Sequence, residues 1–179
     1  KELCEIIELW QRGKHGFNAQ LVSSVTSENV QDHLFKAFDG EGGGLHLLHI
    51  ACHGEPGGDG KGVLIFEDGV PVKVADAIGP HNCKALHGVF LNACHSGLMK
   101  DALLANGAAF VITCNQEVVD KAGLDFAKMF YSRLFAEQSV YEAFEAAEKQ
   151  LKLTQTRQGR KEIVIELHCN VPLLQQKIG

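Results

Sequence analysis

The chain of 179 residues is 45% hydrophobic and 22% charged, an ordinary balance for a soluble globular protein that can bury a core without disulfides. Its formal net charge of −5 argues against a general nucleic-acid binder, and no apolar run is long enough to span a membrane. We therefore expect a single domain over residues 1–179. Because the chain begins at Lys1, we expect this domain to be excised from a longer protein.

The first half of the chain alternates helical and strand patterns. Helical spacing predicts a helix over 2–11, alternating side chains predict a strand over 17–25, and hydroxyl caps open a helix over 26–38. A hairpin is expected over 62–78, with its turn at Asp68-Gly69. Near-continuous apolar runs predict strands buried on both faces, at 45–52, 87–94 and 108–115.

Helices dominate the second half of the predicted pattern. A short helix is expected over 97–107 and amphipathic helices over 122–135 and 139–153. The last of these opens with a capping box formed by Ser139 and Glu142. A basic, polar loop over 154–162 then leads to a final strand over 163–169. Strands that alternate with helices predict an α/β fold with a mostly parallel sheet and helices on both sides.

Six cysteines are spread widely along the chain, and none forms a CxxC pair. Several lie inside apolar runs, where a reduced cysteine packs as a small hydrophobic side chain. This favours an intracellular, reducing location, and we expect the protein in the cytoplasm. No Cys and His spacing matches a standard zinc site, and the glycine-rich stretch 55–62 fails the phosphate-loop spacing. We therefore expect neither a metal nor a cofactor.

Two of the apolar runs end in a reactive side chain followed by glycine. The stretch "HIACHGEPGG" (49–58) presents His53, and "FLNACHSGLM" (90–99) presents Cys94. In parallel sheets function gathers at the carboxyl ends of the strands, so neighbouring strands would bring these side chains over one crevice. A thiolate is a strong nucleophile near neutral pH, and an imidazole can take or give a proton. Either residue alone is more often packing, but the matched contexts favour catalysis.

Acyl transfer also needs hydrogen-bond donors for the oxyanion. Gly54 follows His53 directly and lets a substrate approach its backbone N–H. The backbone N–H of Cys94 is the natural second donor.

The segments "HIACHGE", "GVLIFEDG", "VFLNACHSG", "NGAAFVITCN" and "SVYEAFEAAEKQL" occur in this order. Together they resemble a CHAT domain, a caspase-like peptidase domain related to caspases and separases and often found beside TPR repeats. The resemblance runs from about 17 to about 153. It implies a caspase-like three-layer α/β/α sandwich with a mostly parallel central sheet. It also implies a His–Cys dyad of His53 and Cys94 and oxyanion donation by the backbone of Gly54 and Cys94.

The pocket for the substrate residue before the scissile bond, S1, is less well specified. In the wider clan the position of Asn92 lines this pocket, and this chain departs there from the usual Ser or Gln. Near the strand ends we find acids and no arginine, so we expect a basic or small polar P1 residue. Glu117 or Asp120 would then be the pocket acid. In the alternative interpretation, Asp120 caps the following helix and Glu117 is solvated.

These observations predict a cysteine endopeptidase that cleaves protein or peptide substrates through a thioester acyl-enzyme. We expect regulation by a TPR-type or other neighbouring domain, or by a partner, and the loop over 154–162 is a candidate activation site. One alternative is a catalytically silent caspase-like binding or regulatory module. Another is a small-molecule hydrolase on a flavodoxin-like sheet.

Overall fold

The computed structural model describes six ranges of the chain, and they fall into two units. The described ranges are residues 2–12, 19–38, 46–83, 86–115, 120–158 and 163–169. The first unit draws its described residues from 1–21 and 118–163, and the second unit from 22–117 and 164–171.

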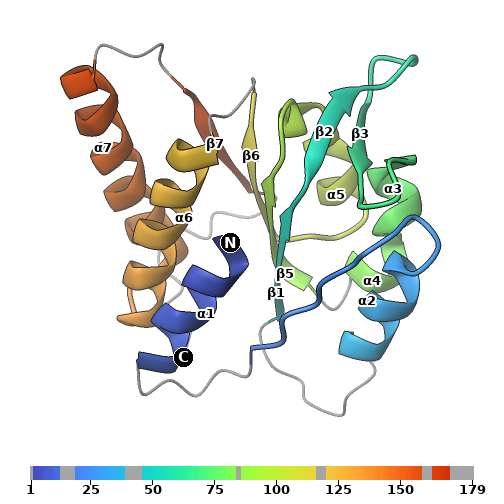
Figure 1. Cartoon of the computed structure of the whole chain (residues 1–179), viewed down its shortest axis with the longest axis horizontal. Coiled ribbons are helices and arrows are strands. Elements are labelled where there is room, and N and C mark those ends of the chain that lie inside the picture. The colour runs from blue at the N-terminus through green and yellow to red at the C-terminus, as the bar shows by residue number, and fades with distance from the viewer. Residues whose placement is uncertain are drawn as a thin grey trace. The chain divides into compact units, whose positions relative to one another are not determined.

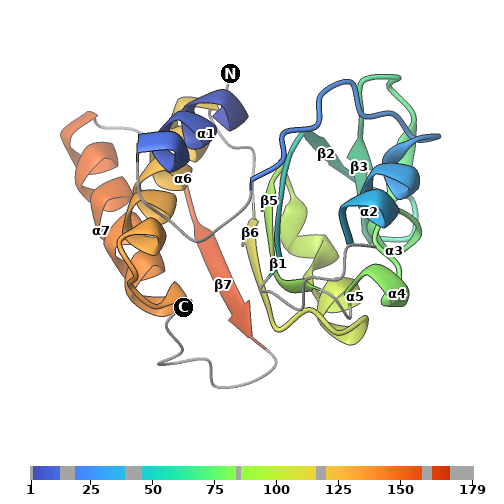
Figure 2. The same ribbon diagram turned by 90° about the horizontal axis from the view of Figure 1, so that it is seen from below.

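The second unit is built on a four-stranded sheet with the order β1-β5-β6-β7 (Figures 1 and 2). Its strands are β1 (His46–Ala51), β5 (Leu86–Asn92), β6 (Phe110–Cys114) and β7 (Ile165–Cys169). β5 is parallel to both β1 and β6, and β7 is antiparallel to β6. Every residue of β6 is buried, as expected from its unbroken apolar run. The predicted α/β fold with a mostly parallel central sheet is confirmed.

A smaller antiparallel sheet leaves the main sheet directly after β1. It contains β2 (His53–Pro56), β3 (Gly62–Ile65) and β4 (Pro71–Lys73), and only Cys52 separates β1 from β2. The predicted hairpin turn is confirmed, because Gly69 has φ +72° and donates its N–H to the Phe66 carbonyl. Glycine suits this turn, since other residues rarely adopt a positive φ.

Short helices cover one face of the four-stranded main sheet (Figure 2). They are α2 (Val30–Phe38), α3 (Val74–Ala77), α4 (Pro80–Cys83), the 3₁₀ helix η1 (Ser96–Met99) and α5 (Lys100–Ala105). Leu103 of α5 and Leu64 of β3 pack with Val89 and Leu91 of β5 and Val111 of β6 in one buried cluster. This cluster fixes the hairpin and η1 against the carboxyl half of β5.

The first unit is helical. It contains α1 (Glu2–Arg12), α6 (Asp120–Phe135) and α7 (Val140–Gln158). The rings of Phe126 and Phe144 join α6 to α7 edge to face, with centroids 5.5 Å apart. The predicted capping box is confirmed, because the Ser139 N–H and hydroxyl both donate to the Glu142 carboxylate and Ser139 Oγ accepts the Glu142 N–H. A helix able to cross a membrane does not occur in the described ranges.

The strand predicted over 17–25 is wrong for its described part, residues 19–25, which forms no strand. Side chains of the β3–β4 turn hold this segment instead. Glu67 accepts the N–H of Ser24, and Asp68 accepts both the N–H and the hydroxyl of Ser27. Ser24 has φ +59°, which breaks the extended backbone that the alternating pattern suggested.

The loop predicted over 154–162 is wrong for residues 154–158, because α7 continues to Gln158. The hydroxyls of Thr154 and Thr156 donate to the carbonyls of Gln150 and Lys152, four residues earlier, and so remain inside the helix. Gln155 is buried, so tertiary packing of this turn overrides its polar sequence. Residues 159–162 lie outside the described part of the chain.

Replacing Gly88 with alanine is expected to lower the free energy of unfolding by about 1–3 kcal/mol, as overpacking of a full core does. Gly88 lies opposite Phe110, and an added Cβ would collide with the buried Phe110 ring. The control is Gly58→Ala, where nothing lies within 4 Å of the added atom. Urea unfolding of both variants measures the difference, and equal midpoints would contradict this packing.

Candidate active site

The main sheet brings the ends of β1 and β5 to the same level. The two parallel strands pair in register up to Ile50 with Leu91 and Ala51 with Asn92. His53 lies two residues beyond Ala51, as the first residue of β2, and Cys94 lies two residues beyond Asn92. Both residues therefore follow the carboxyl ends of neighbouring parallel strands, at the point where β2 leaves the main sheet for the smaller one. Figure 1 shows β1 running into β2 beside β5 at this edge.

Close packing of Gly54 supports this arrangement directly. A Cβ placed on Gly54 would collide with the backbone carbonyl oxygen of Cys94 and would lie 3.1 Å from Ala93 Cβ. Gly54 is the buried residue of β2, while His53 and the other members of the strand are exposed. Only glycine allows β2 to lie this close to the Cys94 backbone.

A tight turn follows Cys94. His95 has left-handed backbone angles, φ 54° and ψ 19°, which cost free energy in a residue with a side chain. Hydrogen bonds hold the turn, from the Ser96 N–H to the Ala93 carbonyl at 3.3 Å and from the Leu98 N–H to the His95 carbonyl at 3.1 Å. Where one helix was expected over 97–107, the chain forms two consecutive helices, η1 (Ser96–Met99) and α5 (Lys100–Ala105).

Sequence reasoning missed two residues that hold this turn. The hydroxyl of Ser96 is fully buried and forms hydrogen bonds with Leu91 and Cys114, at the ends of β5 and β6. The Asn115 side chain lies against Gly97, where an added Cβ would collide with Asn115 Oδ1. Asn115 directly follows β6, as a polar residue at the end of a buried strand, and that signal was present in the sequence. Nothing in the local sequence points to the contacts of Ser96.

The residues expected around S1 are only partly described. Asn92 is the last residue of β5, half-buried and two residues before Cys94. Glu117 lies outside the described residues, and Asp120 begins α6 with a side chain that is not described. The pocket acid therefore stays a prediction.

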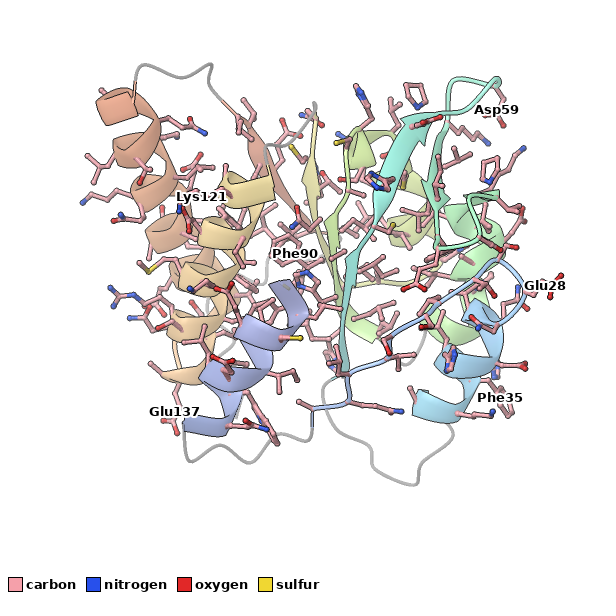
Figure 3. The ribbon with its side chains drawn as sticks, viewed as in Figure 1. Glu28, Phe35, Asp59, Phe90, Lys121 and Glu137 are labelled. Carbon is pink, nitrogen blue, oxygen red and sulfur yellow. The ribbon has the colours of Figure 1, made fainter. Side chains whose placement is uncertain are left out.

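Another acid near the strand ends is already paired. Asp59 lies in the β2–β3 loop (Figure 3) and forms a 2.9 Å ion pair with Lys73. The hydrogen bond from Lys73 holds the pKa of Asp59 below its usual value. In the described ranges, no three His, Cys, Asp or Glu side chains are grouped in a way that could hold a metal ion.

Cys52 and Cys94 have different surroundings. Cys52 packs against the core cluster, on the face opposite to its neighbour His53, as the alternation of strand side chains predicts. Burial raises the pKa of the Cys52 thiol to about 12, and its S–H donates to the His53 carbonyl at 3.3 Å. Cys94 is half-buried at the strand end. The thiol next to the histidine in sequence is thus a packing residue, whereas Cys94 follows the carboxyl end of β5.

The family model of the CHAT domain matches residues 1–171. A search of curated proteins finds no match.

Cys52 is expected to resist alkylation in the native protein, because its raised pKa leaves about 10⁻⁴ of the thiol ionised at about pH 8. Iodoacetamide treatment followed by peptide mapping measures each cysteine separately. Cys4, which is exposed, serves as the internal reference. Cys52 should react at the rate of Cys4 only after denaturation, and equal native rates would contradict its burial.

Replacing Gly54 with alanine is expected to displace the Cys94 backbone and to lower protein stability by about 1–3 kcal/mol. The obstructing atom is a backbone oxygen, which cannot rotate away as a side chain can. The measurement is the alkylation rate of Cys94, with Gly58→Ala as the control. A Cys94 rate and a stability equal to those of the control would contradict the close approach of β2.

Proposed function

The chain belongs to the CHAT domain family, and from this premise we propose that it is a cysteine endopeptidase with His53 and Cys94 as its catalytic dyad. The observation that carries the proposal is that β1 and β5 are parallel neighbours whose pairing ends at Ala51 and Asn92, two residues before His53 and Cys94. Membership of the family supports a caspase-like fold, and the pairing of β1 with β5 supports the choice of His53 and Cys94 as the dyad.

In the proposed reaction the Cys94 sulfur attacks the carbonyl carbon of the scissile peptide bond and His53 takes the thiol proton. The tetrahedral intermediate collapses to a thioester as the C–N bond breaks, and His53 returns the proton to the leaving amine. Water then attacks the thioester, with His53 as the base. The C–S bond breaks, releasing the acid product and restoring Cys94.

The backbone N–H groups of Gly54 and Cys94 would stabilise the oxyanion. The close packing of Gly54 on the Cys94 carbonyl supports this role, because it keeps the backbones of the two residues next to each other. A glycine here also leaves room for the substrate backbone.

We also propose a basic or small polar P1 residue, with Asn92 and either Glu117 or Asp120 lining S1. A carboxylate there would bind Arg or Lys, whereas a pocket for Asp would need Arg.

A neighbouring domain of TPR or other type, or a partner protein, would regulate the activity. We propose a reducing, cytoplasmic location, which the free thiols of Cys4, Cys52, Cys94, Cys114 and Cys169 support.

A library of fluorogenic peptides that varies P1 tests this function. The native chain is expected to cleave peptides with Arg, Lys or small polar P1 residues faster than those with Asp. Cys94→Ala and His53→Ala are each expected to lower kcat/KM by about 10²-fold or more, because each removes a step of nucleophilic or acid–base catalysis. Preferential cleavage after Asp would contradict the proposed S1 pocket.

Matched controls use a cysteine and a histidine away from the crevice. Cys4 is exposed on α1, and His87 is exposed near the amino end of β5. Cys4→Ala and His87→Ala are expected to retain full activity.

A peptidyl electrophile with Lys at P1 distinguishes an enzyme that awaits activation by a partner from a module without catalytic activity. If no peptide is cleaved and labelling of Cys94 does not depend on His53, the chain is a binding module.

A further inference from the structure

Ser96 occupies an unusual position between two strands. Its side chain is fully buried, two residues after Cys94, at the start of η1. Ser96 Oγ accepts the Cys114 N–H at 2.8 Å and donates to the Leu91 carbonyl at 3.1 Å. The Cys114 carbonyl, at 3.4 Å, is a longer alternative acceptor. One hydroxyl thus joins the carboxyl ends of β5 and β6.

The register of β5 and β6 explains what this bridge replaces. The paired residues end at Phe90 with Ile112, and continuing them by two residues would set Asn92 opposite Cys114. In a parallel ladder, that pairing directs the Cys114 N–H at the Leu91 carbonyl. The Ser96 hydroxyl stands between these two groups and satisfies both. The strands are therefore held apart by one oxygen atom where β5 leads into Cys94.

We propose that Ser96 is a positioning residue for Cys94, an inference that rests on the proposed role of Cys94 as nucleophile. Its hydroxyl keeps β5 and β6 apart and fixes the turn that carries the sulfur. Two other residues pack against the same turn. Gly54 lies against the Cys94 carbonyl, and the Asn115 side chain lies against Gly97. Ser96 acts through the backbone, with its side chain inside the protein rather than on the substrate.

Removing the hydroxyl should change the turn. In Ser96→Ala the Cys114 N–H loses its acceptor, and the buried groups on β5 and β6 can satisfy each other only by moving together. Closing that gap moves the start of η1 and, with it, Cys94. A displacement of about 1 Å at a reacting group can cost about 100-fold in rate, so a small shift is measurable.

The experiment measures iodoacetamide alkylation of Cys94 and peptide turnover in Ser96→Ala and Ser96→Thr. For Ser96→Ala we expect kcat to fall by about 10- to 100-fold with KM little changed, and Cys94 alkylation to slow by about tenfold. Alkylation at the exposed Cys4 should stay constant. Alkylation needs no peptidase activity, so it tests the role of Ser96 even if the proposed function fails.

Two comparisons separate positioning from stability. Ser96→Thr keeps the hydroxyl but adds a methyl group to a full site, so it should be less stable than wild type yet more reactive at Cys94 than Ser96→Ala. Ser139→Ala removes another buried serine, the cap of α7, and should lower stability without slowing Cys94. Near-ultraviolet circular dichroism confirms folding of each variant.

Unchanged Cys94 alkylation in folded Ser96→Ala overturns the inference. A folded Ser96→Thr variant in which Cys94 is alkylated as slowly as in Ser96→Ala also overturns it, because threonine keeps the hydroxyl. If Ser96→Ala does not fold, the threonine variant carries the test alone, with Cys94 alkylation expected within about threefold of wild type because the bridge is retained.

Discussion

The parallel pairing of β1 with β5 is the constraint on which the rest of the site depends. Because side chains alternate across a strand, the register decides both which residues share a level and which face each residue takes. Just beyond the end of β1, Cys52 packs against the core cluster and His53 is exposed. A slip of one residue would exchange the two faces, turning the imidazole toward the core and the Cys52 thiol away from it.

The turn after Cys94 is held from several directions by small groups. A glycine in β2 meets its carbonyl, a serine hydroxyl bridges the strands behind it, and Asn115 fills the space that Gly97 leaves. Together these contacts offset the left-handed backbone of His95, a conformation that costs about 1–3 kcal/mol. In this turn the strain falls on His95, the residue next to the proposed nucleophile, where a fixed sulfur position matters most.

Local patterns predicted much of this fold. The buried parallel strands, the turn at Gly69 and the capping box at Ser139 each follow from a few neighbouring residues. The glycines near His53 and Cys94 make these two residues candidates, and their catalytic role stays a prediction. The strand over 17–25 was wrong because contacts from Glu67 and Asp68, some 40 residues away, shape that segment. The Ser96 bridge was out of reach for the same reason, since its partners belong to two different strands.

The extension of α7 to Gln158 bears on how the chain could be cut by another enzyme. Proteases bind their substrates in an extended form over several residues, and a helical backbone cannot enter such a cleft. Arg157 lies in the last turn of α7, so a cut at this residue must wait for that turn to unwind. The rate of such a cut would follow the local unfolding of this turn. A ligand that binds and stabilises the end of the helix would therefore also slow the cleavage.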